Sequence, residues 1–155
     1  MDELDLLNEI KNLENKANHN ELVCRVLNEN DWDTLVSWWD FWPKWQAPPK
    51  DFLPDNGTGG LMIEKNNIPI VAGFMYQTNS KGVLLEWVIS NPKYKDKDRA
   101  EAIERLITEV EKSCVEMGYN YVFTIGRNKS LIEKHRKLGW FVDDKPSHEI
   151  TKKLK

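Results

Sequence analysis

The chain has 155 residues, of which 40% are hydrophobic, and a formal net charge of −3 at pH 7. This length and apolar fraction suffice for one globular domain with its own core. The negative net charge argues against nonspecific nucleic-acid binding as the main task, because such proteins carry an excess of Lys and Arg. No apolar run reaches the ~20 residues of a membrane helix and the N-terminus is acidic, so the sequence predicts a soluble, cytoplasmic protein without a secretion signal.

The cysteines and histidines indicate neither a disulfide nor a metal centre. Cys24 and Cys114 lie in apolar segments, far apart and outside any Cys-x-x-Cys pattern, as expected of buried free thiols in a reducing compartment. His19, His135 and His148 fall in different predicted elements. The sequence also lacks a Ser-His-Asp pattern and the glycine-rich phosphate loop of nucleoside triphosphatases.

Helical spacing of apolar residues predicts an N-terminal helix over residues 2–18. Its apolar stripe consists of Leu6, Leu7, Ile10, Leu13 and Ala17. This helix either packs on the rest of the chain or pairs with a second copy, and the sequence leaves both open, so a homodimer is one expectation. We therefore divide the chain into an N-terminal helix, residues 1–20, and a single domain, residues 21–155.

Strand and turn signals follow this helix. Residues 22–28 are expected to form a strand, after which Asn30 or Asp31 is expected to cap a helix. Residues 61–64 and 68–76 are expected to form a hairpin around an Asn-Asn turn.

Aromatic residues crowd the predicted second helix, since five of the seven tryptophans lie between Trp32 and Trp45. The stripe expected in the core consists of Trp32, Leu35, Val36, Trp39 and Trp42. A neighbouring stripe of Trp38, Phe41 and Trp45, with Phe52 in the turn beyond, suits a pocket for a flat or cationic ligand, or a protein interface. The alternative is a thick core beneath the loop of residues 43–54.

A strand, a helix, a strand and a helix then follow in order. The strands are expected at residues 83–90 and 121–125, and the helices begin near Arg99 and Asn128 and end at Gly118 and Gly139. A strand that leads into a helix N-terminus through a short polar loop commonly builds an anion site from backbone N–H groups. A short final strand is expected at residues 148–154.

Glu86 is the one carboxylate inside the strand of residues 83–90. Strand alternation places it on the same face as Leu84 and Val88, where it is partly desolvated. A carboxylate in such a place is a candidate general base, acting directly or through a water. The alternative is a structural Glu that pairs with a Lys or caps a loop.

The order and spacing of these elements resemble the GNAT N-acetyltransferases over roughly residues 22–155. In that family an Arg/Gln-x-x-Gly-x-Gly/Ala loop leads into a helix that cradles the pyrophosphate of acetyl-CoA. The matching residues are Lys95-Asp96-Lys97-Asp98-Arg99-Ala100, with Asp98 in place of the central glycine. The family then shows an Asn and a helix whose Tyr lies four residues before Gly-Phe, which here correspond to Asn128, His135 and Gly139-Trp140.

The resemblance implies an α/β (α+β) fold with a mixed, mostly antiparallel central sheet flanked by helices, plus the extra N-terminal helix. It implies an acyltransferase that moves an acetyl group from acetyl-CoA to a primary amine by direct attack. The residues that it assigns to CoA are Val88, Ile89, Ser90, Lys95, Lys97, Asp98, Arg99, Ala100 and Asn128. Because the family builds its acceptor site partly from the first helices, Trp38, Phe41, Trp45 and Phe52 are the candidate acceptor residues.

Two family roles compete with structural ones. Asp98 and Glu101 form an Asp-x-x-Glu pattern close to a capping box, which would occupy the N–H groups that should bind pyrophosphate, and Asp96 and Asp98 would repel that anion. His135 is a candidate acid for the departing thiolate, yet it shares a helical face with apolar residues, as a core histidine does.

Three functions therefore remain open from the sequence. The first is the acetyltransferase, with Glu86 as base and His135 as acid. The second is a GNAT-like protein that has lost catalysis and binds a partner through its Trp-rich surface. The third is a bacteriophage-type enzyme that acylates an amine of a modified nucleobase. For this function the basic segment of residues 145–155 could contact phosphates. The alternative interpretation of that segment is a solvated terminal strand.

Overall fold

A computed structural model describes residues 2–19, 21–43, 45–95 and 97–155, with the side chains of all of these except 12–19. The chain divides into two compact units, Met1–Phe123 and Thr124–Lys155. The boundary expected after residue 20 stays a prediction. No helix in the described part of the chain is long and apolar enough to cross a membrane.

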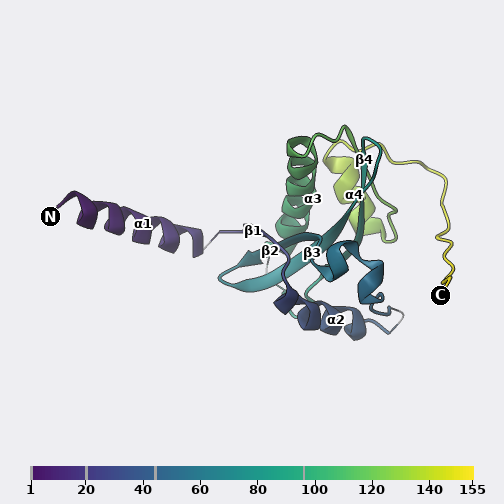
Figure 1. The fold of residues 1–155 in the computed structure, drawn as a ribbon, viewed down its shortest axis with the longest axis horizontal. Coiled ribbons are helices and arrows are strands. Elements are labelled where there is room, and N and C mark those ends of the chain that lie inside the picture. The colour runs from purple at the N-terminus through teal and green to yellow at the C-terminus, as the bar shows by residue number, and fades with distance from the viewer. Residues whose placement is uncertain (1, 20, 44, 96) are drawn as a thin grey trace. The chain divides into compact units, whose positions relative to one another are not determined.

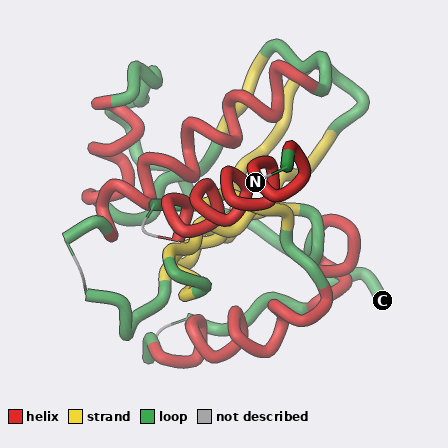
Figure 2. The backbone as a smooth tube through the Cα atoms, turned by 90° about the vertical axis from the view of Figure 1, so that its left-hand side faces the viewer, coloured by secondary structure: helices red, strands yellow, loops and turns green. Residues whose placement is uncertain are grey.

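The larger unit is built on a five-stranded sheet with the strand order β1-β2-β3-β4-β5. The strands are β1 (Val23–Val26), β2 (Gly60–Lys65), β3 (Ile68–Gln77), β4 (Gly82–Ser90) and β5 (Tyr121–Phe123). Neighbouring strands are antiparallel except β4 and β5, which are parallel. The predicted mixed, mostly antiparallel sheet is therefore confirmed, and Figure 2 shows its strands in yellow.

Four α-helices accompany these strands among the described residues. They are α1 (Glu3–His19), α2 (Trp32–Phe41), α3 (Arg99–Glu116) and α4 (Lys129–Lys137), and three short 3-10 turns are η1 (Glu29–Asp31), η2 (Lys50–Phe52) and η3 (Pro54–Gly57). On α1 the leucines at positions 4, 6 and 7 are exposed, whereas Leu13 and Ala17 of the predicted stripe lie outside the described side chains.

Each face of the sheet has its own apolar core. Leu106 and Val110 of α3 pack on one face with Leu85 of β4, whereas Leu35 and Trp39 of α2 pack on the other face. Figure 1 shows α3 and α2 on opposite sides of the strands. This arrangement follows from the two apolar stripes, each of which buries one side of a helix against the sheet.

The hairpin predicted between β2 and β3 is confirmed, with Asn66 and Asn67 at φ 51° and 62° in its turn. Asparagine tolerates this left-handed conformation better than most residues, as a tight hairpin requires. Asp31 occupies the N-cap position of α2, as expected, but makes no side-chain bond to that helix. Asn28 caps the preceding turn η1, since its side chain accepts from Asn30 N–H. Asp31 is occupied otherwise, because its carboxylate accepts from Asn28 N–H and from Arg25.

The cysteines are free, as predicted. Burial raises the pKa of the Cys24 thiol to about 11 and also raises the pKa of Cys114. Both thiols therefore stay protonated near neutral pH and are poor nucleophiles and metal ligands. The described residues contain no cluster of three His, Cys, Asp or Glu side chains suited to a metal.

The strand expected at residues 148–154 was wrong, because the segment that follows α4 has no regular secondary structure. None of the described strands pairs with it, and Ile150 and Leu154 are 91% and 84% exposed. A strand needs a neighbour to accept its backbone hydrogen bonds, and an alternating sequence alone does not supply one. β5 likewise ends at Phe123 rather than at Ile125.

Candidate functional site

The strand that carries Glu86 contains a β-bulge. Phe74 lies opposite Glu86 and Ala72 lies opposite Ile89, so Trp87 and Val88 together lie opposite Gly73. Trp87 has φ 57°, the left-handed conformation that lets one strand accommodate the extra residue.

The bulge changes which residues share a face with Glu86. Trp87 packs with the α2-side core, and Val88 packs with the α3-side core. Glu86 shares the α2 side with Leu84, since their partners Phe74 and Tyr76 pack there. The predicted common face of Glu86 and Val88 was therefore wrong, because simple alternation cannot pass through a bulge.

Gly73 lies opposite the bulge and close to side chains of β4. A Cβ atom added there would lie 3.0 Å from Leu85 Cδ1 and 3.3 Å from Val88 Cγ2. Both side chains belong to β4 and flank the bulge on the α3 side. A glycine in a strand is often found where another chain segment approaches this closely.

β4 has an open edge beyond its first three residues. Its parallel ladder with β5 joins only Gly82–Leu84 to Tyr121–Phe123. The part of β4 that contains Val88, Ile89 and Ser90 therefore extends past β5, and no other described strand pairs with that edge. An extended ligand can bind to such an edge through backbone hydrogen bonds.

The start of α3 lies at the end of the loop that follows β4. Asp98 occupies the N-cap position but makes no side-chain bond to the first turn of the helix. Its two carboxylate oxygens instead accept from Lys65 Nζ and from the Tyr94 hydroxyl, each at 2.8 Å. The predicted self-capping was therefore wrong, because these two donors hold the Asp98 carboxylate.

The first backbone amides of α3 therefore have no side-chain cap from Asp98. The first intrahelical bond runs from Ala102 N–H to Asp98 C=O, so the amides before Ala102 have no partner within the helix. Ala100, in this first turn, is exposed and has a small side chain. Such a helix start can bind an anion.

Charge around this loop is uneven. The hydrogen bond from Lys65, and then that from Tyr94, lower the pKa of Asp98, so this carboxylate is ionised near neutral pH. Lys95 and Lys97 are exposed. Asp96, the other carboxylate expected to repel an anion, lies outside the described residues.

Arg99 links the end of β4 to the loop. Its guanidinium donates to Ser90 Oγ at 2.6 Å and to the Tyr94 carbonyl at 3.4 Å. Asn91 anchors the same loop by donating from its backbone N–H to Ile70 C=O at 2.7 Å. These bonds hold the open part of β4 and the start of α3 together. The guanidinium of Arg99 takes part in them and therefore already has two protein acceptors.

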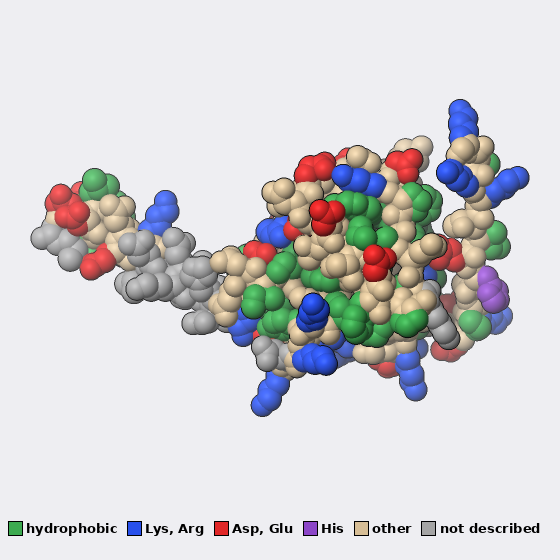
Figure 3. Space-filling view, turned by 90° about the horizontal axis from the view of Figure 1, so that it is seen from below, with side chains coloured by type: hydrophobic (Ala, Val, Ile, Leu, Met, Phe, Trp, Pro, Cys, Tyr) green, Lys and Arg blue, Asp and Glu red, His purple; other side chains and the backbone are tan. Residues whose placement is uncertain are grey.

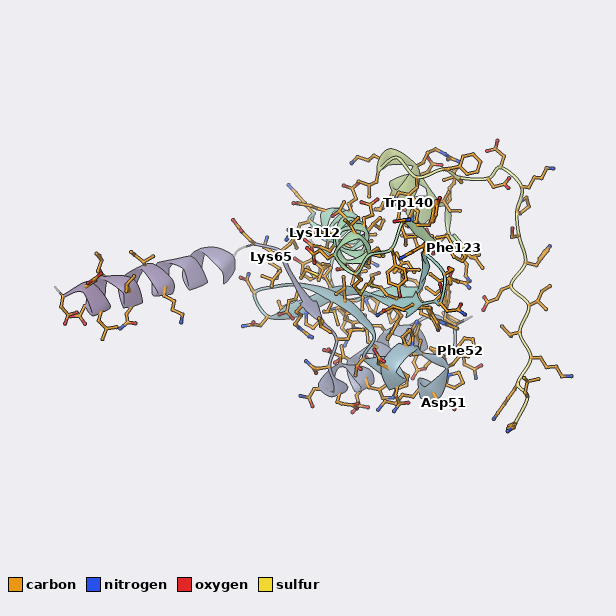
Figure 4. The ribbon with its side chains drawn as sticks, turned by 45° about the horizontal axis from the view of Figure 1, so that its top comes forward. Asp51, Phe52, Lys65, Lys112, Phe123 and Trp140 are labelled. Atoms are coloured by element: carbon orange, nitrogen blue, oxygen red, sulfur yellow. The ribbon has the colours of Figure 1, made fainter. Side chains whose placement is uncertain are left out.

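Glu86 is buried, with 9% of its surface exposed, opposite Phe74 in the ladder and next to Trp87 in the chain. The Trp87 ring lies edge-on to Phe52 of η2, with centroids 6.1 Å apart, and edge-on to Trp39 at 6.4 Å. Tyr76 fixes η2 by donating from its hydroxyl to the Phe52 carbonyl at 3.0 Å. Phe52 is 49% exposed and is marked with its neighbour Asp51 in Figure 4. The fold thus brings Phe52, a predicted acceptor residue, to the bulge beside Glu86.

The remaining aromatic candidates separate into core and surface. Trp38 was expected near the surface but is 4% exposed and packs in the α2-side core, whereas Trp42 was expected in the core but is 38% exposed. Leu35 and Trp39 of the predicted core stripe are fully buried. Trp42 leaves the core because α2 ends at Phe41 and Trp42 is already extended. Phe41 and Trp45 are exposed as predicted, and Figure 3 shows hydrophobic side chains on the side of the molecule where α2 lies.

Asn128 and His135 belong to the smaller unit. Asn128 caps α4 by accepting from Leu131 N–H at 2.8 Å. His135 is 4% exposed, donates from Nδ1 to Leu131 C=O at 2.8 Å, and lies edge-on to the Trp140 ring at 4.6 Å. These contacts favour the core-histidine interpretation, and a catalytic role for either residue stays a prediction.

Sequence reasoning missed Lys65 and Tyr94. Tyr94 is the one aromatic residue in a run of charged residues, and it is 8% exposed in the α3-side core. An aromatic residue in a polar loop is a usable signal of an anchor. Lys65 lies 33 positions before Asp98 and reaches it only through the pairing of β2 with β3, so no local pattern could have revealed it.

Comparison with solved structures gives similar folds at low sequence identity. TTHA1254 from Thermus thermophilus is 20% identical with a TM-score of 0.58, and the match covers 86% of this chain and 98% of that one. The ribosomal-protein-S18-alanine N-acetyltransferase of Escherichia coli is 13% identical with a TM-score of 0.61, covering 77% of each chain. The yncA protein of Salmonella typhimurium, solved with its cofactor acetyl-CoA, is 16% identical with a TM-score of 0.59, covering 80% and 82%.

No protein-family model matches the sequence, and a search of curated proteins finds no match. At identities of 20% or less, the likeness to solved structures shows the fold alone. The fold predicted from the strand–helix–strand–helix order, that of the GNAT acetyltransferases, is confirmed.

Proposed function

We propose that this chain, which has the GNAT fold, is an N-acetyltransferase that transfers the acetyl group of acetyl-CoA to a primary amine by direct attack. The observation that carries the proposal is the uncapped start of α3 beside the open part of β4. The acetyltransferase names and the bound acetyl-CoA among the similar structures support it.

The residues present suit the acyl donor. Amides of the first turn of α3, near Ala100, would bind the pyrophosphate, with Lys95 and Lys97 contributing positive charge. The backbone of β4 from Val88 to Ser90 would bind the extended arm of the donor in the manner of an added strand. Arg99 would act by fixing the loop, because its guanidinium is bonded to Ser90 and to Tyr94.

Bound acetyl-CoA supplies a thioester carbonyl that an amine can attack. The amine nitrogen forms the bond to the carbonyl carbon while the carbon–sulfur bond breaks, and the sulfur leaves as a thiolate, which takes a proton from water. Glu86 takes the proton that the amine releases, directly or through a water, and the aromatic rings around it limit the access of solvent. Phe52 and Trp87 offer flat apolar surface to the acceptor.

Calorimetry with CoA tests the first half of this proposal, with desulfo-CoA and ATP as controls. Micromolar binding of CoA and desulfo-CoA, with much weaker binding of ATP, is the expected result. An acetyl-transfer assay that follows thiol release over a set of primary amines tests the second half. Absence of CoA binding at millimolar concentration would overturn the proposal.

A second function is favoured by the exposed aromatic residues at the end of α2. Phe41, Trp42 and Trp45 are 54%, 38% and 40% exposed, and the rings of Phe41 and Trp42 lie edge-on at 5.0 Å. Aromatic side chains are enriched in protein interfaces. A GNAT-like binding protein without transferase activity would use this surface, and it would bind its partner without CoA.

A further inference from the structure

The end of β2 reaches the start of α3 through one ion pair. Lys65 is the last residue of β2, and its ammonium donates to Asp98 Oδ2 at 2.8 Å. Both side chains are partly shielded, with exposures of 31% for Lys65 and 16% for Asp98. On the other side of the same carboxylate, the Tyr94 hydroxyl donates to Oδ1. Each oxygen of Asp98 thus has a donor that does not belong to α3.

We propose that Lys65 is a positioning residue for the acyl donor, which acts through Asp98 and keeps the first amides of α3 available to a pyrophosphate. This role rests on the proposed function. Lys65 does not need to touch the ligand for this purpose. Its ammonium holds the Asp98 carboxylate away from the helix amides. It also neutralises the negative charge of Asp98, which lies next to the proposed anion site.

The physical reason lies in what an N-cap aspartate ordinarily does. Its carboxylate accepts from the amides at the second or third helical position, which are the amides that an incoming anion would use. In this chain those positions are Ala100 and Glu101, and Asp98 does not bond to them. Without Lys65 the carboxylate loses one of its two outside donors, and its negative charge faces the anion uncompensated.

The ion pair of Lys65 with Asp98 also explains how an aspartate can occupy a position where a glycine would leave the helix amides available. With a glycine, nothing competes for the first turn of the helix. With Asp98 the same opening depends on Lys65 and Tyr94, which hold the carboxylate to the side. The identity of residue 65 should therefore matter only when residue 98 carries a carboxylate.

This dependence makes a four-variant experiment decisive. CoA affinity is measured by calorimetry for the wild type, Lys65→Met, Asp98→Gly and the Lys65→Met/Asp98→Gly double variant. Lys65→Met should weaken CoA about five- to tenfold, as expected when an anion must compete with an N-cap carboxylate. Asp98→Gly should bind at least as tightly as the wild type, and the double variant should recover that affinity.

Lys112→Met is the matched control, since Lys112 is an exposed lysine on α3 (Figure 4) and its loss changes the net charge equally. It should leave CoA affinity within twofold. Lys65→Gln serves as a second variant if Lys65→Met does not fold, because it keeps a long side chain and removes the charge.

Two results overturn the role of Lys65 while leaving the proposed function standing. One is a Lys65 variant that binds CoA as the wild type does. The other is a double variant that stays as weak as Lys65→Met, which would mean that Lys65 contacts the ligand directly. A wild type that fails to bind CoA at millimolar concentration would overturn the proposed function, and this role with it.

Discussion

Phe74 lies directly opposite Glu86 in the β3–β4 ladder and is completely buried. Residues opposite each other in an antiparallel pair share a face of the sheet, so the carboxylate lies beside a fully buried aromatic residue on the α2 side. One residue later the bulge turns Trp87 to the same side, against Phe52 and Trp39. The sheet therefore places one carboxylate among aromatic rings next to the open part of β4.

The first prediction concerns Glu86→Gln. The change keeps the size of the side chain and removes its ability to take a proton, so kcat for acetyl transfer should fall about 10²- to 10⁴-fold, the usual contribution of a general base. CoA affinity should change by less than twofold, because the proposed donor contacts come from backbone amides and lysines. Stopped-flow detection of thiol release and calorimetry measure the two quantities.

Glu116→Gln is the control for this variant, since Glu116 is an exposed carboxylate at the end of α3. It should leave both quantities unchanged. A Glu86→Gln variant that loses CoA affinity and keeps its kcat would contradict the base role and point to a structural carboxylate.

The second prediction separates Trp38 from Trp45. Trp38 is 4% exposed in the α2-side core, so Trp38→Ala should lower the free energy of unfolding by about 3–5 kcal/mol, the typical cost of truncating a buried aromatic residue. Trp45 is 40% exposed, and Trp45→Ala should change stability by less than about 0.5 kcal/mol. Urea unfolding followed by circular dichroism measures both.

Trp45→Ala also tests the exposed aromatic surface. If that surface binds an acceptor or a protein partner, the variant should weaken this interaction while its unfolding midpoint stays that of the wild type. A Trp38→Ala variant as stable as the wild type would show that α2 does not pack as the structure has it.

The fold could be predicted where a local pattern decides the structure. The Asn-Asn turn between β2 and β3 and the start of a helix near Arg99 depend on neighbours in sequence, and both are confirmed. The orientation of Val88 could not be predicted, because the bulge lies in the pairing of β4 with another strand, β3. The assignment of Asp98 failed for the same reason, since its partner Lys65 comes from β2.

The residues of the candidate site also divide into those that a local sequence pattern could indicate and those that it could not. Glu86 stood out as one carboxylate in an apolar strand, a signal contained within eight residues. The burial of Trp38 supports the thick-core alternative, and the sequence alone could not choose it because the helix is aromatic over much of its circumference. The strand expected at residues 148–154 was wrong because pairing, which the sequence does not encode locally, decides whether an alternating segment becomes a strand.

The third prediction concerns His135. His135→Phe removes the bond from Nδ1 to Leu131 C=O at a buried position, which should destabilise the folded chain by about 1 kcal/mol or more and lower its melting temperature. Its kcat, measured well below the melting temperature, should stay within a few-fold of the wild type. His148→Phe, at an exposed histidine, is the control and should leave the melting temperature unchanged. A fully stable His135→Phe variant with a kcat lowered a hundredfold would establish His135 as the acid instead.

The last prediction concerns pH and the ion pair of Arg25 with Asp31. The Nη1 and Nη2 atoms of Arg25 donate to the two Asp31 oxygens, each at 2.8 Å, and only 8% of the Asp31 side chain is exposed. These bonds from Arg25 are the main cause that lowers the pKa of Asp31, and the bond from Asn28 N–H acts in the same direction. Asp31→Asn should therefore cost about 1.5–3 kcal/mol of unfolding free energy at pH 7, the range for hydrogen bonds to charged groups.

The sign of the pH dependence follows from the lowered pKa. A carboxyl with a lower pKa in the folded chain contributes its full stabilisation above the unfolded value of about 3.9, and loses it as the pH falls through the folded value. The difference in unfolding free energy between wild type and Asp31→Asn should thus be constant from pH 7 to about pH 5 and shrink below about pH 4. Asp33→Asn, at an exposed carboxylate of α2, is the charge-matched control measured beside it. If the difference between wild type and Asp31→Asn were the same at pH 3 as at pH 7, the ionised form of Asp31 would not be what stabilises this end of β1.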